Sequence, residues 1–127
     1  MKKIIQTDKA PAPIGPYNQA VRHNGVLYIS GQIALDPISG DLIIDNIEDE
    51  THRVMKNIEG VLEADGLTFE DVIKCSVFVS DINMFSRINA VYGQYFNDAT
   101  APARELVEVA KLPRFVNVEI SVLAASK

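Results

Sequence analysis

Two charged residues near the C-terminus have types and a spacing that could do chemistry. Arg104 follows a segment of small residues and a proline and opens a strand-like run, Glu105–Ala110; Glu119 lies fifteen residues later in a second apolar run. A guanidinium binds a carboxylate ligand by two-point contact, and a carboxylate can act as a general base. An arginine at a strand edge can equally extend into solvent, so the elements that hold the two residues decide between these interpretations.

The last apolar run predicts a strand with Glu119 on its polar face. Residues 115–124 alternate with period two, which is typical of a half-buried strand. One face would carry Val116, Val118, Ile120, Val122 and Ala124, and the other Asn117, Glu119, Ser121 and Leu123. The same alternation places Val107 and Val109 on one face of the preceding strand, and Arg104, Leu106 and Glu108 on the other. If both valine-rich faces look into one core, Arg104 and Glu119 both point away from it.

The remaining pattern predicts a sheet and two helices. We expect strands at 3–7, 18–23, 26–30 and 72–79, with Asn24-Gly25 forming a two-residue hairpin turn. Apolar residues at 3.6-residue spacing predict a helix over 46–65, with Asp45 and Glu48 as a capping box and Gly66 ending it. A second helix is expected over 81–97, with Phe85, Ile88 and Tyr92 among its inward residues.

Two helices can cover only one face of a sheet of five or six strands. The uncovered face would then carry Phe78, Leu106 and Leu123 beside Arg104 and Glu119. Exposed apolar patches of this kind usually mark an interface. The sequence therefore predicts a homo-oligomer.

Composition narrows the class of protein. The 127 residues are expected to form one domain, with 47% hydrophobic content and a net charge of −5. The sequence contains no block of Lys or Arg residues of the kind that binds nucleic acid. It also contains no apolar run long enough for a signal peptide or a membrane span. A single cysteine, Cys75, excludes an internal disulfide and favours a cytoplasmic location. His23 and His52 do not form a ligand-spaced cluster, so no metal is expected. The seven glycines are scattered and form no phosphate-binding loop, and no cofactor is expected.

Short motifs along nearly the whole chain resemble the RidA (YjgF) family of reactive-intermediate deaminases. They are Ile14-Gly15-Pro16-Tyr17, Tyr28-Ile29-Ser30-Gly31-Gln32, Asp36-Pro37-Ile38-Ser39-Gly40, Val77-Phe78-Val79-Ser80-Asp81, Asn89-Ala90-Val91-Tyr92, Pro102-Ala103-Arg104, Glu108-Val109-Ala110-Lys111-Leu112-Pro113 and Val118-Glu119-Ile120. The resemblance implies an α+β, chorismate-mutase-like fold, with a mixed sheet of about six strands and two helices on one face. It also implies a homotrimer with sites in the clefts between subunits.

The activity implied by the resemblance is hydrolysis of 2-imino acids, such as 2-iminobutanoate and 2-iminopropanoate, to 2-keto acids and ammonium. Arg104 would bind the substrate carboxylate, and Glu119 would activate the attacking water. Tyr17, Ser30, Gly31 and Asn89 would complete the binding site. Three of them have an ordinary structural alternative: Tyr17 as a packing residue, Gly31 as a strand end, and Asn89 as a cap on local backbone.

The chain departs from the family pattern directly after the arginine. Many members carry Ser or Thr and then Cys, where this chain has Glu105 and Leu106. A mechanism that needs this cysteine is therefore excluded, whereas an arginine–water–glutamate mechanism is not. The alternatives are a non-enzymatic binder of small 2-keto acids, an RNA-directed role and a chaperone-like role. The acidic net charge and the absence of a histidine pair for acid–base cleavage weigh against the RNA-directed role.

Overall fold

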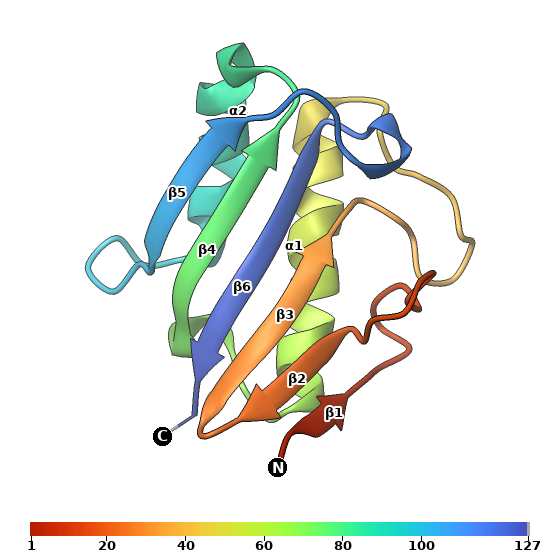
Figure 1. Cartoon of the computed structure of the whole chain (residues 1–127). Coiled ribbons are helices and arrows are strands. Elements are labelled where there is room, and N and C mark those ends of the chain that lie inside the picture. Colours follow the sequence, from red (N-terminus) through yellow and green to blue (C-terminus); the bar gives the residue numbers. More distant parts are fainter. Residues whose placement is uncertain (127) are drawn as a thin grey trace.

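The chain folds into one twisted sheet with two helices, and the computed structural model describes residues 1–126 (Figure 1). The strands are β1 (Lys3–Ile5), β2 (Ala20–His23), β3 (Val26–Gln32), β4 (Val72–Val79), β5 (Ala103–Glu108) and β6 (Val118–Ala125). The helices are α1 (Ile47–Ala64) and α2 (Phe85–Tyr92). The order across the sheet is β1-β2-β3-β6-β4-β5, so the last strand lies in the middle. The predicted mixed six-stranded sheet with two helices is confirmed.

Among the strands of residues 1–126, only β4 and β5 pair in parallel, and α2 provides the crossover between them. The Asn24-Gly25 turn is confirmed, since both residues have positive φ, at 51° and 80°. This pair of conformations matches the twist of the flanking strands, which is why Asn-Gly is favoured there. Among residues 1–126, no helix is long and apolar enough to cross a bilayer.

The first helix begins one residue later than the capping pattern indicated. Asn46, rather than Asp45, is the N-cap, and its side-chain oxygen accepts a hydrogen bond from the backbone N–H of Asp49 at 2.8 Å. Gly66 follows the helix with φ 72°, as predicted. The α1 side chains Val54, Ile58, Val61 and Leu62 are fully buried against the sheet.

The second helix is shorter than the predicted 81–97. It is flanked by 3₁₀ turns at Ile82–Met84 and Gly93–Tyr95. The expectation that Phe85 packs inward is wrong: its side chain is 42% exposed, whereas Ile88 and Tyr92 are buried. Phe85 lies at the first position of the helix, where the chain has only just turned onto the sheet.

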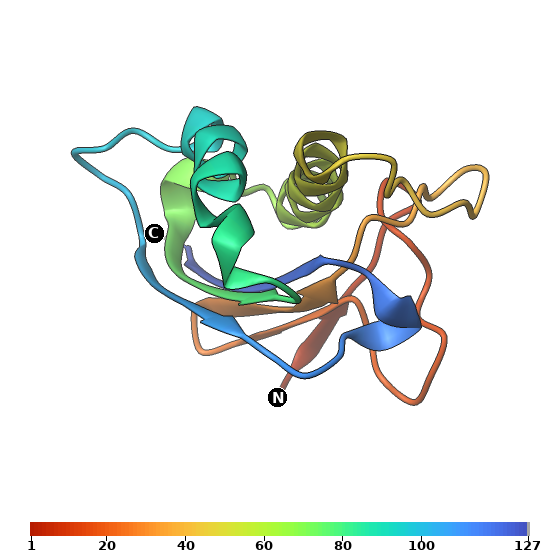
Figure 2. The same ribbon diagram turned by 90° about the horizontal axis from the view of Figure 1, so that it is seen from above.

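Both helices lie on the same side of the sheet, and the opposite side has no helix over it (Figure 2). The core lies between these layers. From β6 it receives the predicted face, Val118, Ile120, Val122 and Ala124. The face without helices, called the open face below, carries the side chains of Tyr28, Phe78, Val107, Glu119 and Leu123, among others.

The predicted facing of β5 is wrong. Arg104 is paired with Cys75 and Leu106 with Val77, and both partners are fully buried under the helices. Arg104 and Leu106 therefore lie on the helix side, while Val107 lies on the open face and is 44% exposed. Alternation indicates which residues share a face, but it does not indicate which face a neighbouring helix will cover. In an edge strand of mixed composition, that choice is made by pairing with β4.

Candidate functional site

The side chain of Arg104 is held by residues of α2 and does not extend freely into solvent. Its Nη1 donates to the side-chain oxygen of Asn89 at 2.7 Å. The guanidinium carbon lies 4.9 Å from the ring centre of Tyr92 and 5.7 Å from that of Phe85. Aromatic faces attract a guanidinium and limit its rotation. Asn89, Tyr92, Phe85 and Arg104 are called the arginine half-site below.

The side chain of Asn89 thus bonds the side chain of Arg104 rather than a backbone group. Of the two interpretations of this residue, capping of local backbone is not observed, because its oxygen accepts from Arg104. Glu108, which follows Arg104 along β5, holds backbone rather than a cation. Its carboxylate accepts from the backbone N–H of Ile82 at 2.9 Å and so holds the turn that leads into α2.

Glu119 projects from the middle of the sheet onto the open face, where it lies against Gly31 of β3. A Cβ built on Gly31 would lie 2.7 Å from Oε2 of Glu119 and 2.9 Å from its Cδ. The carboxylate therefore occupies space that any other residue type at position 31 would fill. Burial raises the pKa of the Glu119 carboxyl above its ordinary value of 4.5. A carboxylate with a raised pKa is a stronger base.

A β-bulge in β3 brings Ser30 and Gly31 together beside β6. Ile29 is paired with Val122 and Gln32 with Ile120, so Ser30 and Gly31 both lie opposite the single residue Ser121. The Ser30 hydroxyl donates to the carbonyl of Asn18 at 2.6 Å, and this bond ties the strand to the preceding loop. The hydroxyl proton is therefore already in use, and Ser30 can offer a ligand only its oxygen lone pairs.

Tyr17 borders a narrow hollow that it shares with Gly31, Ile14 and Leu35. Its side chain is 49% exposed, so it is a wall residue rather than a core residue. The buried Gln19 supports this loop, because its side chain bonds the backbone of Thr7, Ala10 and Pro11. Tyr17, Ser30, Gly31 and Glu119 are called the glutamate half-site below.

The two half-sites cannot serve one small molecule within a single chain. Arg104 lies on the helix side of the sheet and Glu119 on the open face. They are two strands apart, and Glu119 is level with Val107, three residues beyond Arg104. Strand spacings then separate the two Cα atoms by about 14 Å, with the sheet between the side chains. Within one chain, Arg104 contacts Asn89, Tyr92 and Phe85, and Gly31 links Glu119 to the hollow lined by Tyr17, but the two half-sites do not meet.

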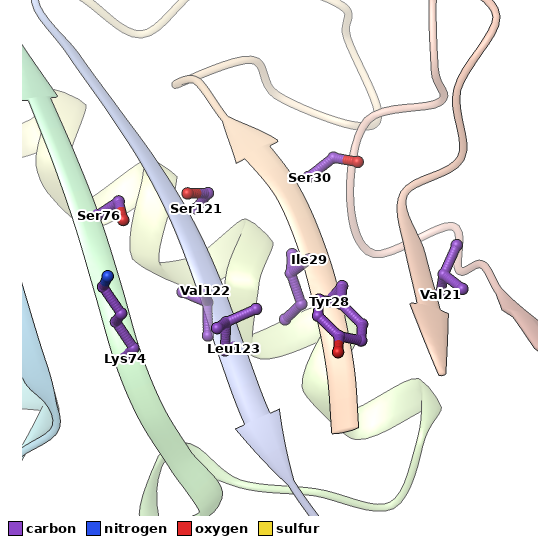
Figure 3. Close-up of a pocket in the computed structure, with 9 residues that line it drawn as sticks. All are labelled: Val21, Tyr28, Ile29, Ser30, Lys74, Ser76, Ser121, Val122 and Leu123. Atoms are coloured by element: carbon purple, nitrogen blue, oxygen red, sulfur yellow. The ribbon is translucent and has the colours of Figure 1, made fainter. Parts of the chain in front are cut away.

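The open face also has a shallow hollow between β3 and β4 (Figure 3). Tyr28 and Leu123 form its apolar part, and Ser76, Ser121 and Lys74 form its polar part. Lys74 makes a salt bridge to Glu105 at 3.2 Å, while Tyr28 is 46% exposed. The predicted apolar character of this face is confirmed for Phe78 and Leu123 but not for Leu106, which lies on the other side.

Leu106 replaces the family cysteine on the same side of the sheet as Arg104, and it packs against the core. Cys75, which pairs with Arg104, is fully buried, as expected for a small apolar residue, and burial raises the pKa of its thiol. It is therefore a poor nucleophile. Within residues 1–126, no three His, Cys, Asp or Glu side chains lie close enough to hold a metal ion.

Sequence reasoning missed three residues of this region, and each has a signal in the sequence. Tyr92 lies three residues after Asn89, so both contact Arg104 from one side of α2. Phe85 lies four residues before Asn89, again one turn away. Glu50, which is buried beneath the start of β6, is an acid on the apolar stripe between Ile47 and Val54. An acidic residue at a core position is itself the signal.

Comparisons with known proteins agree with this structure. The family model described as Endoribonuclease L-PSP matches residues 7–126. A RutC family protein of Synechocystis sp. is 52% identical over 123 residues, which cover 96% of this chain and 95% of the relative. This chain belongs to the RidA (YjgF) family. The predicted family is thereby confirmed.

Two further RidA-family relatives bear on function. The 2-iminobutanoate/2-iminopropanoate deaminase of Bos taurus is 46% identical over 124 residues, which cover 98% of this chain and 90% of that protein. The crystal structure of E. coli TdcF with bound serine has a TM-score of 0.92 and 39% identity, covering 98% of this chain and 99% of that one. The family therefore includes imine deaminases and a protein that binds a small amino acid.

Proposed function

We propose that this chain is a 2-imino acid deaminase that works as a homotrimer, with each active site built from the arginine half-site of one subunit and the glutamate half-site of the next. The observation that carries the proposal is the position of the two half-sites on opposite faces of one sheet. A second subunit is the direct way to bring them together. The exposed apolar side chains of the open face, Tyr28 and Val107 among them, supply a surface for such contact.

Arg104 would bind the carboxylate of the substrate. Asn89 and the two aromatic rings hold the guanidinium in one orientation, so its planar fork is ready before the ligand arrives. Two charge-assisted hydrogen bonds would fix the imine carbon in place. This is a positioning effect, and it needs neither a metal nor a cofactor.

Glu119 would move the protons. It takes a proton from water as the oxygen attacks the iminium carbon, and it passes that proton to the nitrogen of the carbinolamine. It then accepts the hydroxyl proton as the C=O bond forms and the C–N bond breaks, and finally protonates the departing ammonia. One iminium ion and one water thus give one 2-keto acid and one ammonium ion, and Glu119 returns to its starting ionised state. Burial raises the pKa of Glu119, which makes its carboxylate a better proton acceptor for these steps.

Complementation between inactive variants tests this site directly. Arg104→Lys keeps the charge but loses the two-point contact, and Glu119→Gln keeps the shape but loses the base. Each variant alone should hydrolyse imine, generated from threonine by a dehydratase, at least about a hundredfold more slowly than wild type. Arg114→Lys and Glu63→Gln are the matched controls, because both side chains lie outside the half-sites, and they should keep the wild-type rate.

Mixing the two inactive variants gives the deciding result. After subunit exchange at equal amounts, roughly a quarter of the sites in a cyclic trimer combine an intact Arg104 with an intact Glu119. Recovery of about that share of activity would support a site shared between subunits. No recovery despite mixed trimers, or a stable monomer by light scattering, would refute it. Keto-acid binding without any wild-type acceleration of hydrolysis would instead favour a non-enzymatic binder, the function in keeping with the serine bound to TdcF.

A further inference from the structure

Glu50 is a fully buried carboxylate that the reaction described above does not use. It lies in the first turn of α1, and its relative exposure is 0%. It makes no salt bridge within residues 1–126. A buried charge without a counter-ion is unfavourable unless hydrogen bonds stabilise it. Three donors do so here, and all three belong to the chain that begins β6.

These donors lie immediately before Glu119. One Glu50 oxygen accepts from the backbone N–H of Asn117 at 2.7 Å and from that of Val118 at 3.1 Å. The other accepts from the Asn117 side-chain amide at 2.8 Å. Asn117 is also tied to the end of β4, because its carbonyl accepts from the Ser80 N–H at 3.0 Å. The chain that leads into Glu119 is therefore fixed from α1 and from β4.

The segment before this anchor is strained. Arg114 and Phe115 both have positive φ, at 54° and 57°, a conformation that L residues other than glycine rarely adopt. Such strain persists only where the surrounding structure holds it. A shift of one residue in β6 would carry Glu119 to the opposite face of the sheet. Even a small shift matters, because the Glu119 carboxylate already fills the space beside Gly31.

We propose that Glu50 is a positioning residue for Glu119: it fixes the backbone of Asn117 and Val118 so that the Glu119 carboxylate stays beside Gly31. This inference rests on the proposed role of Glu119 in imine hydrolysis. The task requires a hydrogen-bond acceptor at the position of the Glu50 oxygens, and it does not require a negative charge. This distinction makes the inference testable with near-isosteric variants.

Three substitutions separate acceptor, charge and position. Glu50→Gln keeps an oxygen for both backbone N–H groups, and the Asn117 amide can turn to accept from the new amide. Glu50→Met keeps the length but removes every strong acceptor, and Glu50→Asp keeps the charge but withdraws it by one methylene. Glu48→Met is the matched control, since Glu48 lies in the same helical turn but is only partly buried and pairs with Arg87.

The measurements are kcat, KM and amide hydrogen exchange in the intact oligomer. Glu50→Gln should keep kcat within about twofold, while Glu50→Met and Glu50→Asp should lower it by about tenfold or more with KM nearly unchanged. Faster exchange of the Asn117 and Val118 amides should accompany the loss. The exchange readout does not depend on activity.

The outcomes distinguish this inference from the proposed function. Absence of hydrolysis by the wild type refutes the proposed function. If the wild-type protein hydrolyses imine, then a folded Glu50→Met or Glu50→Asp variant whose kcat equals that of the wild type overturns the positioning role. This holds even if the variant has a lower melting temperature. A Gln variant as slow as the Met variant also overturns it, because the charge would then be essential. If Glu50→Met does not fold, Glu50→Asp decides.

Discussion

Gly31→Ala is the smallest change that should separate activity from folding. The backbone of Gly31 is outside the left-handed region, so alanine fits there without backbone strain. The added methyl group, however, would lie 2.7 Å from Oε2 of Glu119. Since an ordinary contact is about 3.5 Å, the carboxylate must move by roughly 0.8 Å or more. The added methyl would also lie 2.9 Å from Cδ and 3.1 Å from Cγ, so Glu119 must rotate most of its side chain away from Gly31 to relieve the clash.

The magnitude follows from that displacement. A misplacement of about 1 Å in a catalytic group can lower the rate by about a hundredfold, which corresponds to roughly 2.7 kcal/mol of transition-state stabilisation. The effect on stability should be small, within about 1 kcal/mol, because alanine restricts the unfolded chain and the displaced group is a flexible side chain. We therefore expect a folded oligomer with a much lower kcat and nearly unchanged affinity for a 2-keto acid.

The assay is imine hydrolysis, with thermal unfolding and light scattering on the same samples. Gly93→Ala is the matched control: a Cβ there meets nothing within 4 Å, and its φ of −63° suits alanine. The control should keep full activity and gain about 0.4–1 kcal/mol in stability. Wild-type kcat in Gly31→Ala would show that the carboxylate need not lie beside Gly31, and the role given to Glu119 would fall with it.

Two further predictions concern pH and backbone strain. Burial raises the pKa of Glu119, and the carboxylate must be ionised to act as a base, so the rate of hydrolysis should fall as pH drops through a value above 4.5. The residual activity of Glu119→Gln should not show this fall at acidic pH. The same fall in the variant would contradict the assignment of Glu119 as the base. Phe115 has φ 57° and is 78% exposed, so replacing it tests the backbone conformation rather than core packing. In thermal melts, Phe115→Gly should be more stable than Phe115→Val by about 1 kcal/mol or more, because glycine adopts positive φ without strain. Equal stability of the two variants would show that this turn is not strained.

The local patterns of the sequence determined most elements of the fold. The span of β4 was predicted without error, α1 to within a residue at each end, and the Asn24-Gly25 turn at its positions. These features depend on periodicity and on the conformational preferences of single residues, which act over a few neighbours. The resemblance to the RidA family, also contained in the sequence, gave Arg104 and Glu119.

The site depended on contacts between distant segments, which local patterns do not contain. Pairing with β4 turned Arg104 toward α2, where Asn89 and Tyr92 hold it, although alternation alone allowed either face. The bulge in β3 places Gly31 against Glu119. The Glu50 carboxylate accepts a hydrogen bond from Asn117, which lies sixty-seven residues later in the sequence. The alternation of a strand is symmetric between its two faces, so only tertiary packing could decide that Arg104 and Glu119, the two main residues of the candidate site, lie on opposite sides of one sheet.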